Sequence, residues 1–135
     1  MENSELQFIC AFAADDEKHF TSSHFGDAEF YLIYVINSDS IEFAGRIDNT
    51  SIETDAHADP EKAKSVSVIM KNKGVQVLVS RRFGPNIVRV RNHFVPVLVK
   101  RAEIEEGIKV VQDNLEAINE QWNMDSNQRK HLTFK

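Results

Sequence analysis

The alternation of apolar and polar positions is most informative between residues 75 and 99, where two apolar runs flank a more polar segment. Residues 75–79 and 95–99 are rich in valine. Nearly continuous apolar runs of this length are typical of strands that are buried on both faces. The segment between them is opened by Gly84 and Pro85, and proline suits the first turn of a helix. The pattern therefore predicts a strand, a short helix and a second, parallel strand.

Three further strands are predicted before this unit. Residues 6–13 and 28–36 are apolar nearly throughout, and residues 41–49 begin with alternating apolar and polar positions. The turn at residues 37–40 is too short for a crossover, so the strands that it joins are expected to be antiparallel. Residues 17–27 show no sustained period and predict a loop, and long loops in compact domains are commonly binding loops.

Two longer helices complete the prediction. The first begins at Asp59 and Pro60, which favour a helix start, and ends at Gly74, which favours a helix stop; Ala63 and Val66 belong to its buried stripe. The second covers residues 103–122, where apolar positions recur at spacings of four and three. Periodicity fades after residue 122. We therefore expect a single domain over residues 1–122 and a mobile, polar tail over residues 123–135.

The element order is βββαβαβα, which predicts an α/β fold with a mixed sheet of five strands. If the first strand lies in the middle, the strand order is 3-2-1-4-5, with a switch point between strands 1 and 4. Ligands of such sheets bind beyond the carboxyl ends of the strands. The residues expected at that edge are Asp15, Asp16, His24, Asn49, the loop through His57, and residues 81–84.

Charge and composition narrow the ligand class. The formal net charge of -5 argues against general nucleic-acid binding, which usually needs a positive face. Basic residues nevertheless crowd the valine-rich unit: Arg81, Arg82, Arg89, Arg91, Lys100 and Arg101. This distribution favours a small anionic ligand, although the arginines could also simply solvate the ends of helices and strands.

The same composition suggests a compartment. The single cysteine, Cys10, cannot form an internal disulfide and is expected in the core. The chain has no apolar run long enough to cross a membrane, and its first residues are acidic where a signal peptide would be basic. We expect a soluble, cytoplasmic protein without a membrane partner.

Several segments together resemble a known family. They are residues 8–13, the Ser-His-Phe-Gly segment 23–26 leading into strand 30–34, Asn49, residues 74–85 with their terminal Gly-Pro, and strand 95–99 with its following helix. Over about residues 6–120 they resemble the dinitrogenase iron-molybdenum cofactor biosynthesis and binding family. The resemblance implies a ribonuclease-H-like fold and a carrier or scaffold for an anionic iron-sulfur-type cofactor, with His24 as its ligand.

One departure from the family bears on the ligand. Small members of the family usually carry small residues after the fourth strand, whereas this chain has Arg81, Arg82 and Phe83. The two arginines could pair with an anionic cluster, narrow the pocket, or bind a different anion.

The predicted binding residues are His24, Phe25, Gly26, Asn49, Arg81, Arg82, Phe83 and Gly84. His24 is the expected metal ligand, because one imidazole can attach a cluster exchangeably; its alternative role is a hydrogen bond that caps its loop. The arginines would neutralise charge, and backbone donors near Gly26 and Gly84 would close on the ligand.

The other histidines are weaker candidates. His19 and His57 lie on polar loops, where histidines are usually solvated. His93 is expected to cap the short helix, and His131 falls in the predicted tail.

The expected function is therefore non-enzymatic: a carrier of iron-molybdenum cofactor or its precursor in nitrogen fixation, with cofactor-biosynthesis or nitrogenase-type proteins as partners. One cysteine is too few for a conventional iron-sulfur centre, and no paired-histidine motif supports zinc hydrolysis. A metal-dependent nuclease could use Asp15 or Asp16, but the arginines after strand 4 would repel its metals. An anion-sensing or protein-interaction module is the remaining alternative.

Overall fold

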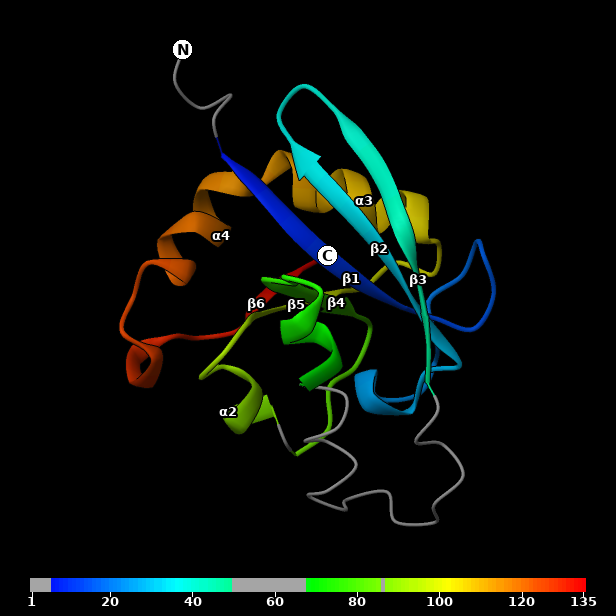
Figure 1. Cartoon of the computed structure of the whole chain (residues 1–135), viewed down its shortest axis with the longest axis horizontal. Coiled ribbons are helices and arrows are strands. Elements are labelled where there is room, and N and C mark those ends of the chain that lie inside the picture. The colour runs from blue at the N-terminus through cyan, green and yellow to red at the C-terminus, as the bar shows by residue number, and fades with distance from the viewer. Residues whose placement is uncertain (1–5, 50–67, 86) are drawn as a thin grey trace.

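Six strands and several helices make up the described part of the chain, residues 6–49, 68–85 and 87–135 of a computed structural model (Figure 1). The strands are β1 (Gln7–Ala14), β2 (Phe30–Asn37), β3 (Ile41–Asp48), β4 (Val77–Ser80), β5 (Val95–Val99) and β6 (Leu132–Phe134). The α-helices are α2 (Ile87–Val90), α3 (Ile104–Asp113) and α4 (Leu115–Trp122), and the 3-10 helices are η2 (Phe25–Asp27) and η4 (Ser126–Gln128). Residues 68–72 are also helical.

The strands form one mixed sheet in the order β3-β2-β1-β4-β5-β6. β2 is antiparallel to β1 and to β3, whereas β1, β4 and β5 are parallel. The predicted order of the first five strands is therefore confirmed, and with it the switch point between β1 and β4. Because two antiparallel pairings separate β3 from β1, the carboxyl ends of β1, β3 and β4 share one edge, which we call the carboxyl edge.

The predicted number of five strands was wrong, because β6 extends the sheet beyond β5. β6 is parallel to β5, with Val97 opposite Leu132 and Val99 opposite Phe134. Pro96 marks where this pairing can begin. The Val95 amide donates to the Gln76 carbonyl on the β4 side, so the backbone nitrogen of the next residue faces the β6 side. That residue is proline, whose nitrogen carries no proton to donate. The finer assignment of the sheet as ribonuclease-H-like stays a prediction.

The long carboxyl-terminal helix is divided where the sequence predicted continuity. Asn114 separates α3 from α4; its side-chain amide donates to the Val110 carbonyl at 2.7 Å, and its φ of -127° is not helical. Side chains of this type compete with the helical hydrogen bonds of the backbone. No helix in the described part of the chain is long and apolar enough to span a membrane.

The helix predicted to end at Gly74 is seen only at its end. Residues 68–72 are helical, and Gly74 takes a positive φ of 76°, as a helix-stopping glycine does. Met70 of this turn is fully buried. The start of the helix at Asp59, and the predicted core positions Ala63 and Val66, lie outside the described residues.

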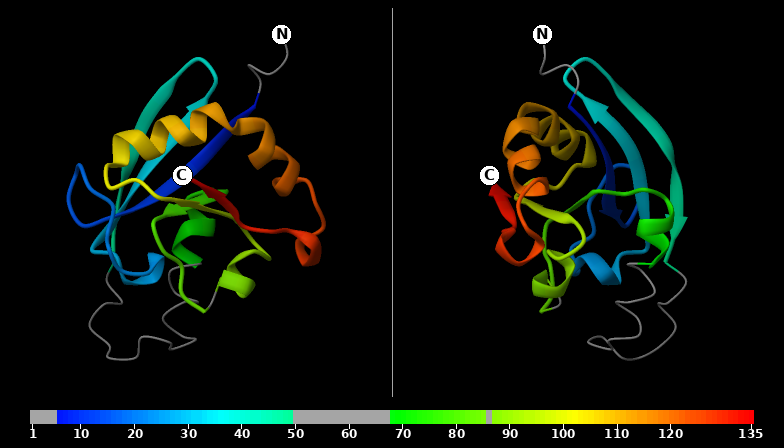
Figure 2. Two further views of the ribbon diagram at one scale, coloured as in Figure 1. Left: turned by 180° about the vertical axis from the view of Figure 1, so that it is seen from behind. Right: turned by 60° about the vertical axis from the view of Figure 1, so that its left-hand side comes forward.

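Apolar side chains pack on both faces of the sheet. Figure 2 shows from two further sides that α3 and α4 lie together on one side of it. α3 and α4 cover one face, over Phe12, Val79 and Val97 among others. The helical turn at residues 68–72 and the 3-10 helix η2 contribute to the cover of the other face. β4 is buried along its whole length, as its apolar run predicted. Cys10 lies in the first of these cores, and burial raises the pKa of its thiol.

Candidate functional site

Two loops meet at the carboxyl edge, one after β1 and one after β4. The Phe25 amide donates to the Arg82 carbonyl at 2.9 Å, and the rings of Phe25 and Phe83 stack with centroids 5.5 Å apart and planes 14° apart. The Arg82 guanidinium also donates to the Ser22 carbonyl at 3.3 Å. The structure thus brings together the two segments that the sequence placed at one edge, and it ties them by backbone, ring and side-chain contacts.

His24 lies at the junction of these loops. It occupies the position before the first residue of η2, yet its side chain makes no capping hydrogen bond there; its carbonyl accepts from the Asp27 amide at 2.9 Å. The imidazole is half-buried and packs on Gly84, since a Cβ atom added at Gly84 would lie 3.0 Å from His24 Nδ1. The expected alternative role for His24, a capping bond, is therefore not what this side chain does in η2.

Asn49 is buried beside the His24 loop and supports it through hydrogen bonds. Its side-chain amide donates to the carbonyls of Gly26 and Ala28, both at 2.9 Å, and lies 3.2 Å from the Tyr31 hydroxyl. That hydroxyl donates to the Phe25 carbonyl at 2.8 Å. Burial, and then the charge of Asp27, raise the pKa of Tyr31, so the hydroxyl keeps its proton and remains a donor. Asn49 therefore stabilises the His24 loop through hydrogen bonds to the backbone of that loop.

Arg81 and Arg82 are both exposed beside this loop. Ser80, the last residue of β4, is buried, and its hydroxyl accepts from the Arg82 amide at 3.4 Å. Burial of Ser80 fixes where β4 ends, and the two arginines follow at the surface. The guanidinium of Arg82 donates to the Ser22 carbonyl. The neighbouring Arg81 is exposed as well.

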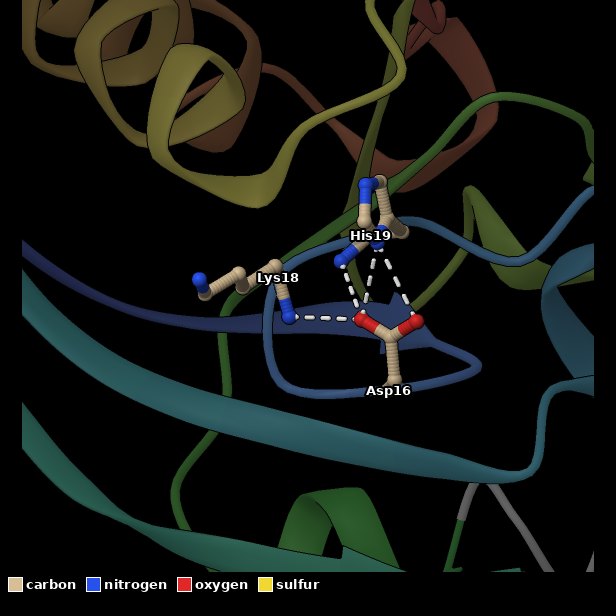
Figure 3. Close-up of polar contacts among 3 residues, drawn as sticks. All are labelled: Asp16, Lys18 and His19. Atoms are coloured by element: carbon tan, nitrogen blue, oxygen red, sulfur yellow. Dashed lines mark hydrogen bonds and ion pairs between the residues drawn. The ribbon is translucent and has the colours of Figure 1, made fainter.

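The loop that leaves β1 forms a compact turn around Asp16 (Figure 3). The Asp16 carboxylate accepts from the amides of Lys18 at 2.7 Å and His19 at 2.8 Å, and His19 Nδ1 lies 3.0 Å away. These contacts, led by the Lys18 amide, hold the pKa of the Asp16 carboxyl below its ordinary value. One of the two carboxylates that a nuclease could use for metal binding, that of Asp16, is thus engaged with its own turn.

Phe20 anchors the same loop in the core, and the sequence analysis missed it. Phe20 is 4% exposed, bridges Ala14, and its ring centroid lies 6.1 Å from that of Phe12. Its ring also lies against Gly107 of α3, where an added Cβ would come within 2.4 Å of it. The one available signal was an aromatic residue isolated in a polar segment.

The remaining histidines lie apart from these contacts or outside the description. The His93 side chain lies 3.3 Å from the Lys71 ammonium, and desolvation, Lys71 and Arg129 lower its pKa. His131 is exposed just before β6, and His57 lies outside the described residues. Within residues 6–49, 68–85 and 87–135, no group of three or more histidine, cysteine, aspartate or glutamate side chains is arranged to hold a metal ion.

These features define a mixed α/β domain whose candidate binding site is made by two joined loops at the carboxyl edge, with one imidazole and two arginines. The chain belongs to the dinitrogenase iron-molybdenum cofactor family, whose model matches residues 7–120. No curated protein matches it.

Solved structures with the same fold come from distant sequences. One is the crystal structure of a protein from Methanocaldococcus jannaschii described as a candidate dinitrogenase, at 14% identity and a TM-score of 0.54, covering 81% of this chain and 91% of that chain. Another is the NMR structure of a candidate NifB protein from Thermotoga, assigned to the DUF35 family, at 20% identity and a TM-score of 0.58, covering 80% and 90%. At these identities the likeness establishes the fold alone.

Proposed function

We propose that this chain is a non-enzymatic carrier domain for an anionic iron-sulfur-type metal cofactor, namely iron-molybdenum cofactor or its precursor. His24 attaches the metal, and Arg81 and Arg82 balance the negative charge. Backbone donors around Gly26 and Gly84 close on the cluster. The cluster is cargo, received from one protein and delivered to another.

The observation that carries the proposal is the position of the His24 side chain and the contacts that it makes. A half-buried imidazole lies at the switch-point edge, on a loop fixed by the Phe25–Arg82 bond, and makes no capping bond in η2. An imidazole that is held in place by its loop and makes no capping bond there is suited to an external partner. Family membership makes a metal cluster the first candidate for that partner.

The donor set suits a preassembled cluster better than a free metal ion. A lone metal ion in a protein is usually held by several side chains, and such a group is absent from the described residues. A preassembled cluster already has its internal ligands, so one imidazole and neighbouring cations are sufficient for weak, exchangeable attachment. A carrier needs weak attachment of this kind, because it must release its cargo.

The remaining parts of the proposal follow from this role. The partners are proteins that build the cofactor or receive it, the compartment is the reducing cytoplasm, and the domain has no catalytic residues of its own. The cofactor site lies within the domain predicted over residues 1–122, and β6 adds the last strand to the sheet of that domain. We also retain the ribonuclease-H-like fold as part of the proposal.

The test is an anaerobic titration of the purified protein with isolated iron-molybdenum cofactor and with its iron-only precursor, followed by visible absorption and native mass spectrometry. Wild type should bind one equivalent saturably. His24→Ala should bind at least ~10-fold more weakly, the lower range for losing an interaction that matters to a metal site. His131→Ala, which removes an exposed imidazole far from both loops in sequence, is the matched control and should bind as wild type does.

Two results would overturn parts of the proposal separately. Binding by His24→Ala with wild-type affinity would remove His24 as the ligand. No binding of either cluster by the folded wild-type protein would remove the carrier role itself, and ligand screening would then turn to other anions at Arg81 and Arg82.

A further inference from the structure

The backbone conformation at position 84 does not by itself call for glycine. Among the described residues the glycines with a positive φ are Gly45 and Gly74, so the backbone of Gly84 is one that alanine can adopt. Gly84 also precedes Pro85, which favours extended conformations that suit any residue. A side chain at position 84 is therefore limited by the space around it rather than by its backbone.

That space is filled by the imidazole of His24. A Cβ atom at position 84 would lie 3.0 Å from Nδ1, 3.4 Å from Cγ and 3.6 Å from Cε1 of His24. The first of these distances is shorter than ordinary van der Waals contact, so either the ring or the loop would have to move. Gly26, in the same loop as His24, differs: a Cβ there would meet no atom within 4 Å.

The ring has little freedom to move away. The loop of His24 is bonded to the loop of Gly84 through the Phe25 amide and the Arg82 carbonyl, 2.9 Å apart, and through the stacked rings of Phe25 and Phe83. A methyl group at position 84 would therefore contact the imidazole, because these two interactions keep the two loops close together. The ring would have to rotate about its own side-chain bonds.

We propose that Gly84 is the positioning residue of the binding site: because it has no side chain, the face of the His24 ring near Nδ1 can lie against the loop after β4. This inference rests on the proposed carrier function. Nδ1 and the two ring carbons bonded to it are the atoms nearest to a Cβ at position 84, at 3.0–3.6 Å, so the contact is with the face of the ring near Nδ1. Without that Cβ the ring keeps its orientation against the loop after β4.

The experiment compares Gly84→Ala, His24→Ala and the double variant with wild type. The probe is isolated iron-molybdenum cofactor, added anaerobically, and the readouts are its dissociation constant, thermal unfolding, and the ¹⁵N shifts of the His24 ring without cofactor. Gly84→Ala should weaken binding at least ~10-fold and shift the ring nitrogens. His131→Ala, which removes an exposed imidazole far from both loops in sequence, should leave those ring shifts near the wild-type values.

The double variant makes the test independent of folding. If position 84 acts through the imidazole, then adding Gly84→Ala to His24→Ala should change the unfolding temperature less than adding it to wild type. An equal change in both backgrounds would overturn the inference, even if Gly84→Ala is unstable.

The outcomes also separate this inference from the proposed function. Loss of binding in His24→Ala, with wild-type binding and ring shifts in Gly84→Ala, would overturn the role of Gly84 and leave the carrier proposal standing. Wild-type binding in His24→Ala would overturn both.

Discussion

Single side chains hold the candidate site together, and Asn49 is one of them. Its amide nitrogen reaches two carbonyls and a hydroxyl in the loop that carries His24. From the sequence, Asn49 is predicted to be a binding residue. The structure gives it a supporting position, 7% exposed, in which its effect on a ligand would pass through the loop.

Asn49→Ala should therefore lower the free energy of unfolding by about 1–3 kcal/mol, because it leaves buried carbonyls without their donor. Urea denaturation measures the change. Asn92→Ala, at an exposed asparagine between α2 and β5, is the control and should shift stability by less than about 0.5 kcal/mol. Equal stability of the Asn49 variant and wild type would show that water replaces the amide.

Both arginines should contribute to the binding of an anionic cluster. Arg81→Ala and Arg82→Ala should each weaken binding of an anionic cluster, and the double variant should also reduce the dependence of affinity on salt, since exposed charges are screened. Titrations at low and high ionic strength measure both effects. Lys109→Ala, which removes an exposed cation paired with Asp113 on α3, should leave affinity and salt dependence unchanged.

Arg82→Ala alone should also loosen the site, because it removes the bond to the Ser22 carbonyl. An exposed bond of this kind is worth at most about 1 kcal/mol, so the variant should still fold. If the double variant failed to fold, the arginines would be structural and the charge argument would lose its basis.

At the scale of elements, the loop between β1 and β2 is held against α3 by ring packing and by backbone hydrogen bonds. Phe20 inserts where Gly107 leaves room, and the backbone of this loop is bonded to the segment before α3 through Phe20 and Ala102 at 2.9 Å. The position of α3 therefore helps to determine where the His24 loop begins.

Gly107→Ala tests this packing by the sign of its effect. In an ordinary helix interior the change would stabilise by about 0.5–1 kcal/mol. Here the new methyl group would overlap the buried Phe20 ring, so we expect a loss of about 1–3 kcal/mol in urea denaturation. A Phe20→Leu background should reduce this loss, because leucine is shorter. A stabilised Gly107→Ala variant would contradict the packing argument.

What the sequence could predict also differs from element to element. β4 and β5 were predictable because strands buried on both faces carry nearly continuous apolar runs. The break at Asn114 was not, since Ile108, Val111, Leu115 and Ile118 keep helical spacing across it. The contact between His24 and Gly84, and the hydrogen bonds from Asn49, join distant segments and leave no pattern along the chain. The sequence could place these residues at one edge but could not assign their roles.

At the scale of the whole molecule, β6 is a strand that lies beyond the family match, which ends at residue 120. The strand covers the edge of β5, and Leu132 and Phe134 pack on the core that α3 and α4 cover. The Lys100 amide donates to the Phe134 carbonyl at 3.1 Å, so this strand reaches the carboxyl end of β5. An uncovered β5 would present unpaired backbone groups beside valine side chains.

Deleting residues 132–135 should therefore have two effects. Stability should fall by about 2 kcal/mol, since two half-buried apolar side chains are lost and full burial of each is worth about 1.5–3 kcal/mol. The bare edge should also promote self-association, because open strand edges pair with other chains. Urea denaturation and size-exclusion chromatography with light scattering measure the two effects. A chain lacking only Lys135 keeps β6 and serves as the control; if both truncated chains unfolded at the urea concentration of the full chain, β6 would be a passive extension, and the edge of β5 would not need its cover.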